Sequence, residues 1–116
     1  MKKLFVLASI TVTILIFTNC SSSKKTTAAI PKLNYTANVQ TVIMAHCTPC
    51  HIPAKGGNKK AYDNYENVKT DIDEIIRRIE LNPGEKGFMP FKKNVKLSDS
   101  TIAVFKQWRD DGLLEK

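Results

Sequence analysis

The chain has 116 residues, of which 42% are hydrophobic and 25% charged, and its formal net charge is +7. Four of the eighteen basic residues lie within the first 25 positions, and from Lys32 onward fourteen basic and eleven acidic residues leave a net charge of only +3. Without a dense basic stripe this balance argues against a nucleic-acid-binding protein, and the length beyond Lys32 suits one small domain.

The first 19 residues are predicted to be a signal peptide rather than part of the fold. Lys2 and Lys3 form a positive start, and residues 4–17 form an apolar stretch too short for a settled transmembrane helix. Cys20 and three serines follow, a layout that resembles a bacterial lipoprotein signal. The resemblance implies cleavage before Cys20 and attachment of a lipid to that residue. An ordinary cleaved signal peptide and an uncleaved N-terminal anchor are the alternatives.

Residues 20–32 are rich in Ser, Thr, Lys and Ala and show no apolar periodicity, so we expect a flexible tether that carries the lipid anchor. Residues 33–116 are expected to form one domain. Its first helix is predicted from side chains that recur at the spacing i, i+3, i+4, i+7, namely Val39, Val42, Ile43 and His46.

Residues 47–51 read CTPCH, a C-x-x-C-H run, which is the attachment signature of a covalently bound c-type haem. The thiols of Cys47 and Cys50 lie one helical turn apart and can add to the vinyl groups on one edge of a porphyrin. His51 then lies beneath the iron and can bind it from the proximal side. The run therefore predicts one covalent haem c.

Two other uses of a C-x-x-C pair fit this chain less well. Zinc would need two further ligands, and only Cys20 and His46 remain. A redox dithiol would be expected in a βαβ unit, which this sequence does not predict. If Cys20 carries lipid and the other two Cys carry haem, no thiol is left over. The export signal agrees with this reading, because such haems are attached outside the cytoplasm.

Two later helices are predicted with well-marked ends. One starts in an acidic turn at Asp71, passes through Arg77 and Arg78 in its last part and carries isoleucines at positions 72, 75, 76 and 79. The other begins after Ser98, a good N-cap, and ends at Gly112. A shorter helix over residues 62–69 is a weaker expectation. Because the β-branched residues recur at helical rather than alternating spacing, the fold class is expected to be all-α.

Residues 81–97 contain two prolines and two glycines and are expected to form a long loop, which in a small domain is usually functional. Met89 lies in this loop, 38 residues after His51. A Met thioether on the distal side raises the reduction potential of a haem relative to a second His, so Met89 is the expected distal ligand. Met44 and His46, both just ahead of the haem motif, are the weaker candidates.

At this point the chain resembles the class I monohaem cytochromes c. The resemblance rests on the C-x-x-C-H run, on Met89-Pro90 in a late loop and on an aromatic last helix around Trp108, and it covers about residues 34–114. It implies three to four helices around one covalently attached haem, with the first and last helices packed together and Trp108 in the core. The residues that would meet there are Val39, Val42 and Ile43 from the first helix and Ile102, Phe105 and Trp108 from the last.

One feature departs from that family. Many members have a proline about a dozen residues after the proximal His, and its carbonyl accepts a hydrogen bond from the ring Nδ1–H. The corresponding stretch here, residues 60–64, contains no proline. An acceptor is still expected, but its residue is not identified.

Some polar and glycine positions near the motifs have weaker expectations. Gly56-Gly57 is expected to form a turn, and the alternative is that it lets the backbone approach the haem. The candidate partners of the haem propionates, each with a solvated alternative, are Arg77, Arg78 and Tyr62. The lysines that flank the ligand loop either steer acidic redox partners or keep the loop solvated, and they are Lys92, Lys93 and Lys96.

Together these features predict an electron-transfer protein rather than an enzyme, because ligation by His51 and Met89 leaves no open position on the iron. Its expected partners are redox proteins and, through Cys20, a membrane, with no nucleic acid; a monomer is the default. We expect an exported protein that is periplasmic or held on the outer face of a membrane. The alternatives are a haem relay subunit of a larger oxidase or dehydrogenase and a haem protein with an open distal site.

Overall fold

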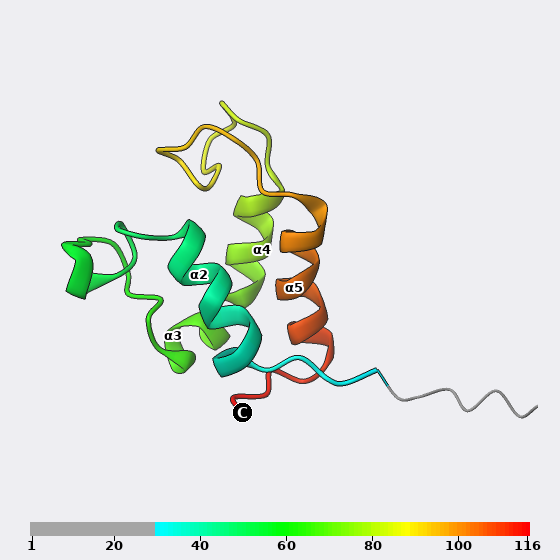
Figure 1. Ribbon diagram of the computed structural model, residues 1–116. Coiled ribbons are helices and arrows are strands. Elements are labelled where there is room, and N and C mark those ends of the chain that lie inside the picture. Colours follow the sequence, from blue (N-terminus) through cyan, green and yellow to red (C-terminus); the bar gives the residue numbers. More distant parts are fainter. Residues whose placement is uncertain (1–29) are drawn as a thin grey trace, which may run out of the picture. The chain divides into compact units, whose positions relative to one another are not determined.

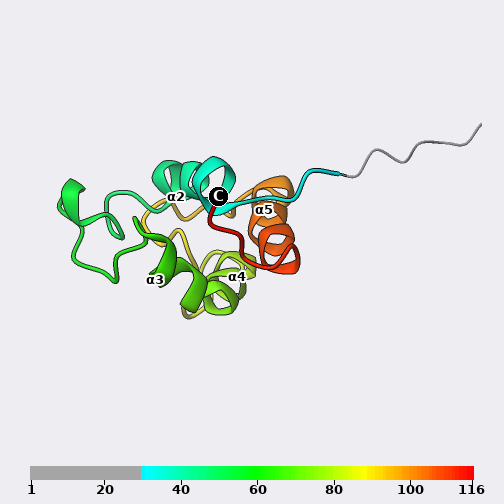
Figure 2. The ribbon, with the colours of Figure 1, turned by 90° about the horizontal axis from the view of Figure 1, so that it is seen from below.

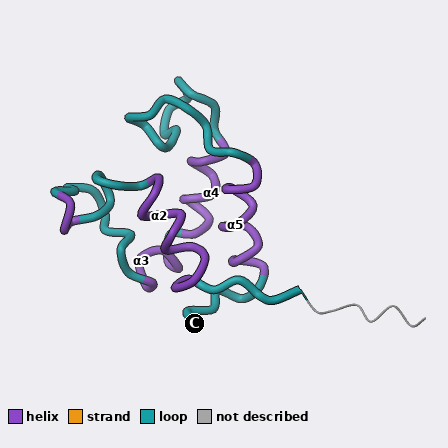
Figure 3. Tube along the Cα trace, viewed as in Figure 1, coloured by secondary structure: helices purple, strands orange, loops and turns teal. Residues whose placement is uncertain are grey.

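The computed structural model describes residues 30–116, so the expected signal peptide, Cys20 and most of the tether lie outside the described residues. The described chain is helical (Figure 1, Figure 3). In chain order its elements are η1 (Tyr35–Val39), α2 (Gln40–His46), η2 (Pro53–Lys55), α3 (Tyr65–Thr70), α4 (Ile72–Glu80) and α5 (Asp99–Asp110). Between residues 30 and 116 there is no β-strand, only an isolated bridge between Asn34 and Leu114. The all-α expectation is confirmed for this part of the chain.

Side-chain caps decide where three of the helical segments begin. Asn34, Asn64 and Ser98 each accept a hydrogen bond from the backbone N–H three residues later, at 2.8, 3.0 and 3.2 Å. The cap predicted at Ser98 is confirmed, as is the end of α5 before Gly112, whose φ is +100°. The helix expected over residues 62–69 starts later than predicted, because Asn64 is itself extended and caps α3, which begins at Tyr65.

α4 has the amphipathic pattern that its sequence predicts. All four of its isoleucines are buried, while Glu74 and Arg77 lie on the exposed face. Fully burying an aliphatic side chain of this size contributes about 1.5–3 kcal/mol. The apolar face, more than helix propensity, therefore holds this nine-residue helix in place.

α4 and α5 lie side by side and run in opposite directions, joined by the loop over residues 81–98 (Figure 1). Seen from below, α2, α4 and α5 lie on three sides of the interior of the domain (Figure 2). The expected contact between the first and last helices is present, and it is made through η1, which packs on α5. Trp108 is fully buried there, 6.1 Å from the ring of Tyr35, and its Nε1–H donates to the Leu114 carbonyl at 2.7 Å. The expectation that Trp108 belongs to the core is confirmed.

Backbone bonds tie the start of the domain to its end. The Tyr35 N–H donates to the Leu114 carbonyl at 2.8 Å, and the Leu33 N–H donates to the Asp111 carboxylate at 2.7 Å. Residues 31–116 form one compact unit. Every helix in residues 30–116 is too short or too polar to span a bilayer.

Candidate functional site

A cavity of about 920 Å³ lies among the turn after α2, the start and inner face of α4, and the loop over residues 81–98. Small-molecule and cofactor sites commonly occupy roughly 300–1,000 Å³, so this cavity is near the top of that range. Cys47, Cys50, His51 and Met89 all line it. Four residues predicted from two separate parts of the sequence are therefore brought to one space.

Cys47 is the residue just after α2, and Cys50 lies in the turn that follows it. The helix ends at His46, and the chain continues as hydrogen-bonded turns in which the His51 N–H donates to the Cys47 carbonyl at 3.1 Å. Both Cys residues are unpaired and half-buried. Burial raises the pKa of the Cys47 thiol to about 11, so this thiol is protonated at neutral pH in the unmodified chain.

The His51 ring is held in one tautomer by the backbone. Its Nδ1 lies 2.7 Å from the carbonyl oxygen of Lys60, and because a carbonyl can only accept, Nδ1 must carry the proton. Nε2 then keeps its lone pair and can bind a metal. An acceptor was expected but its residue was not identified, and Lys60 is the first residue of the stretch that corresponds to the family's proline. Its residue type gives no signal, because any residue can offer a backbone carbonyl.

Three side chains beside His51 form what we call the His51 clamp, made of Lys60, Tyr62 and Asp71. The Tyr62 ring stacks on the imidazole, with ring centroids 4.5 Å apart and planes 8° apart. The Tyr62 hydroxyl donates to the Asp71 carboxylate at 3.0 Å, and the Lys60 ammonium contacts the same carboxylate at 2.8 Å. Burial, and then the bond to Asp71, raise the pKa of Tyr62 above its ordinary value. Asp71 was not among the predicted site residues.

Gly57 brings the segment before Lys60 tightly against the C-x-x-C-H turn. A Cβ at this position would lie 2.3 Å from the Pro49 carbonyl oxygen and 2.7 Å from that of Cys50. The neighbouring Gly56 has φ +79° and ends η2, so the turn expected at Gly56-Gly57 is confirmed. Gly57 has the additional, unpredicted function of allowing this close backbone approach.

Met89 is positioned by the residues around it. Its N–H donates to the Arg78 carbonyl at the end of α4, at 3.2 Å, and the side chain of Phe88 just before it is buried. The Met89 side chain is half-buried and packs against the core while lining the cavity. Met44, the weaker candidate, is exposed on α2 and does not line the cavity. His46 does line it, so both side chains remain within reach of a group bound there.

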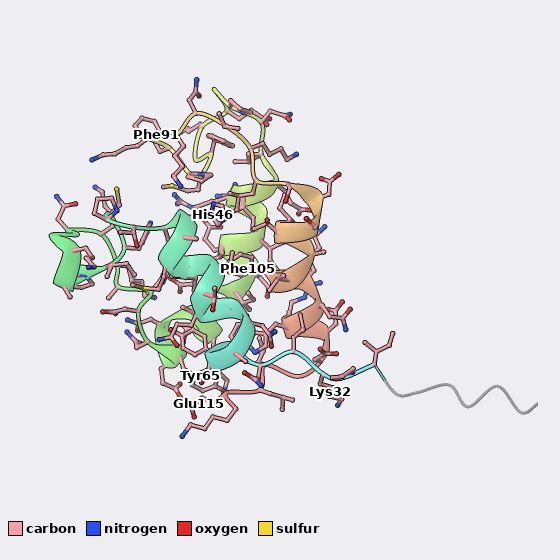
Figure 4. The ribbon with its side chains drawn as sticks, in the orientation of Figure 1. Lys32, His46, Tyr65, Phe91, Phe105 and Glu115 are labelled. Carbon is pink, nitrogen blue, oxygen red and sulfur yellow. The ribbon has the colours of Figure 1, made fainter. Side chains whose placement is uncertain are left out.

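The remaining lining of the cavity is apolar inside and cationic near its edge. α4 and α5 supply Ile75, Ile79 and Phe105 to the interior. Figure 4 shows Phe105 inside the helices, and His46 at the end of α2 near the loop that carries Phe91, which is 75% exposed. The charged lining residues are Lys59, Lys60, Arg78, Lys92 and Lys93 against Asp71 and Glu74. The excess of cations favours an apolar ligand that carries negative groups.

Some of the residues predicted to contact the propionates or partner proteins line the cavity, and others do not. Arg78 lines the cavity, whereas Arg77 does not; both donate to Glu74, at 2.6 and 2.7 Å respectively. Lys93 lines the cavity and also donates to the Ala45 carbonyl at 3.1 Å, which ties the loop to α2. Lys96 lies instead on a smaller cavity of about 220 Å³.

Within residues 30–116 there is no group of three or more His, Cys, Asp or Glu side chains placed to hold a metal ion. Cys47, Cys50 and His51 are therefore not gathered around one ion, and they face a space much larger than an ion instead. No protein-family model, curated protein or solved structure matches the chain.

Proposed function

We propose that this protein is a single-haem c-type cytochrome that carries electrons between exported or membrane-bound redox proteins, and that it is not an enzyme. The observation that carries the proposal is that Cys47, Cys50, His51 and Met89 all line one cavity. The apolar interior of that cavity and its cationic edge also suit a porphyrin with two propionates.

Each of these residues has one role in the proposal. Cys47 and Cys50 hold haem c through thioether bonds, and His51 is the proximal ligand through Nε2. The Lys60 carbonyl keeps the proton on Nδ1 and increases the basicity of the ring. Met89 is the distal ligand. The haem supplies a one-electron couple whose potential a Met ligand raises relative to a second His, and two protein ligands leave no open position for a substrate.

The packing of the helices is compatible with a cytochrome c-like domain over residues 33–116, with three to four helices around one haem. Two observations support this assignment. The segment that leads into the C-x-x-C-H turn packs on the last helix through η1, and the loop with Met89 lies on the cavity beside it. We infer that the haem adds apolar mass that a domain this small otherwise lacks.

The proposal includes a location and partners. The N-terminal pattern supports an exported lipoprotein, periplasmic or on the outer face of a membrane, with the lipid on Cys20 and residues 20–32 as the tether. Its partners are redox proteins rather than nucleic acid, and it acts as a monomer.

The decisive experiment expresses the full chain in a host that attaches haem to exported proteins. A pyridine haemochrome spectrum of the purified protein should show covalent haem, and a redox titration should give a single one-electron couple. Reduced protein that binds carbon monoxide readily at neutral pH would exclude six-coordination by two protein ligands. Absence of covalent haem would refute the proposal as a whole.

Met89 has a matched control in Met44, which is exposed and outside the cavity. The variant Met89→Ala should lose the weak long-wavelength sulfur-to-iron band and should have a lower potential, because the thioether that raises the potential is gone. Met44→Ala should keep both properties. An unchanged spectrum and potential in Met89→Ala would contradict the assignment of Met89 as distal ligand. Loss of the sulfur-to-iron band in Met44→Ala would instead identify Met44 as that ligand.

The lipid anchor is tested by mass spectrometry of the mature N-terminus. The wild-type protein should begin at Cys20 and carry acyl chains, and Cys20→Ala should lose both the added mass and the membrane association. A mature protein with a free thiol at Cys20, or one cut elsewhere, would rule the anchor out.

A further inference from the structure

The contacts of the His51 clamp form a closed loop that begins and ends at the His51 ring. From the imidazole, one path runs through the Nδ1–H to the Lys60 carbonyl, and from the Lys60 ammonium to Asp71 Oδ1. The other path runs from the imidazole face to the Tyr62 ring and from the Tyr62 hydroxyl to Asp71 Oδ2. The two paths meet on the two oxygens of one carboxylate. A single side chain therefore holds both the hydrogen-bond acceptor and the stacking partner of His51.

Asp71 can hold Lys60 and Tyr62 in place because it is the residue just before α4, a helix whose four isoleucines are buried. Its carbonyl accepts from the Ile75 N–H at 2.8 Å, and Ile72 and Ile75 are buried in the core. Although Asp71 precedes α4, its side chain makes no capping bond, so both carboxylate oxygens serve the clamp. The bond from the Lys60 ammonium lowers the pKa of Asp71 against the opposing effect of burial, so the carboxylate is charged at neutral pH.

We propose that Asp71 is a positioning residue for the proximal ligand, and that it sets the orientation and the basicity of His51 through Lys60 and Tyr62. This inference rests on the proposed function for its consequence at the iron, but the clamp itself consists only of residues of this chain. The physical reason is that a ring held on one edge and one face cannot rotate without breaking a bond or the stack. A weaker bond at Nδ1 makes the ring a poorer donor at Nε2.

The variant Asp71→Asn tests this directly. The amide replaces one carboxylate oxygen with an NH₂ donor and removes the negative charge. The Tyr62 hydroxyl can accept from that NH₂, whereas the Lys60 ammonium can only donate, so the charge-assisted bond from Lys60 becomes weaker or is lost. Glu74→Gln is the matched control. Glu74 also lines the cavity, but its carboxylate accepts hydrogen bonds from Arg77 and Arg78 and none from the clamp. Both variants remove one negative charge from the lining of the cavity.

The readout is the exchange of the His51 Nδ1 proton with solvent, followed by ¹⁵N NMR in the reduced protein, where low-spin ferrous iron is diamagnetic. Asp71→Asn should accelerate the exchange about tenfold, as expected when the charge-assisted bond from Lys60 is lost. Tyr62→Phe, which keeps the ring and loses the hydroxyl, should accelerate it in the same direction. Glu74→Gln should remain within about twofold of the wild type, because it leaves all clamp bonds intact.

The reduction potential gives a second readout. Both charge-removing variants should raise the potential, and Asp71→Asn should raise it further, because it also weakens the Nδ1 bond. Equal exchange rates in Asp71→Asn and Glu74→Gln would overturn the positioning role. If Asp71→Asn does not fold, Tyr62→Phe decides, and wild-type exchange in that variant would overturn it. The exchange of the Nδ1 proton can be compared among the variants whether or not haem is attached. A protein without haem would refute the proposed function, and the same comparison of exchange rates would still support or overturn the positioning role of Asp71.

Discussion

Gly57 offers a test of how tightly the haem-motif turn and the segment after it must pack. In Gly57→Ala, the new methyl group would lie 2.3, 2.7 and 2.8 Å from the carbonyl oxygens of Pro49, Cys50 and Ile52, whereas ordinary contact begins at 3.4 Å. The nearest oxygen must therefore move by about 1 Å. All three atoms belong to the backbone, so no side chain can rotate away to relieve the clash.

The cost follows from this rigidity. Overpacking a well-packed site costs typically about 1–3 kcal/mol, and a clash with three backbone atoms belongs at the upper end. For a domain of this size, about 3 kcal/mol corresponds to a fall in Tm of roughly 12–24 °C. Because the same segment carries the Lys60 carbonyl to His51, the proposed function predicts that the variant also has a lower yield of covalent haem.

Gly56→Ala is the matched control one residue earlier. Gly56 has φ +79°, and a methyl group added there would meet no atom within 4 Å, so its cost is only that of a left-handed residue, about 1–2 kcal/mol. Thermal unfolding of both variants, followed by circular dichroism alongside haem content, separates the two causes. A Gly57→Ala protein that is as stable as Gly56→Ala would refute the close approach.

Two further predictions concern helix ends and acid. Ser98→Ala should lower the free energy of unfolding by about 1 kcal/mol because it removes the cap of α5, whereas Ser100→Ala should change it little; equal losses in chemical denaturation would contradict the cap. The bonds from two arginines lower the pKa of Glu74 from 4.5 to about 2, so its ion pairs stabilise the fold fully above pH 4.5 and lose that effect as the pH falls through 2. The difference in Tm between wild type and Glu74→Gln should therefore shrink between these pH values, and a difference that grows toward acid would contradict the sign.

The helices could be predicted because their signals are local. The isoleucine spacing of α4, the Ser98 cap and the stop at Gly112 each depend on residues within a few turns of one another, and all three expectations hold in the structure. The predicted start of α3 was wrong by three residues, because the non-helical segment before Asn64 instead brings Lys60 and Tyr62 to His51. In that segment a tertiary contact outweighs the helical pattern.

The sequence by itself determined the chemical groups that this chain carries: two thiols and an imidazole at fixed spacing, a distant thioether and an N-terminal pattern that predicts export. These depend on residue type and short-range order, which are fully visible in a sequence. Only the tertiary structure decided that Met89 and His51 line the same cavity, that a Lys60 carbonyl holds the ring, and that Asp71 joins Lys60 to Tyr62. Backbone acceptors and partners between segments have no signature in residue type, because they come from how the chain returns on itself.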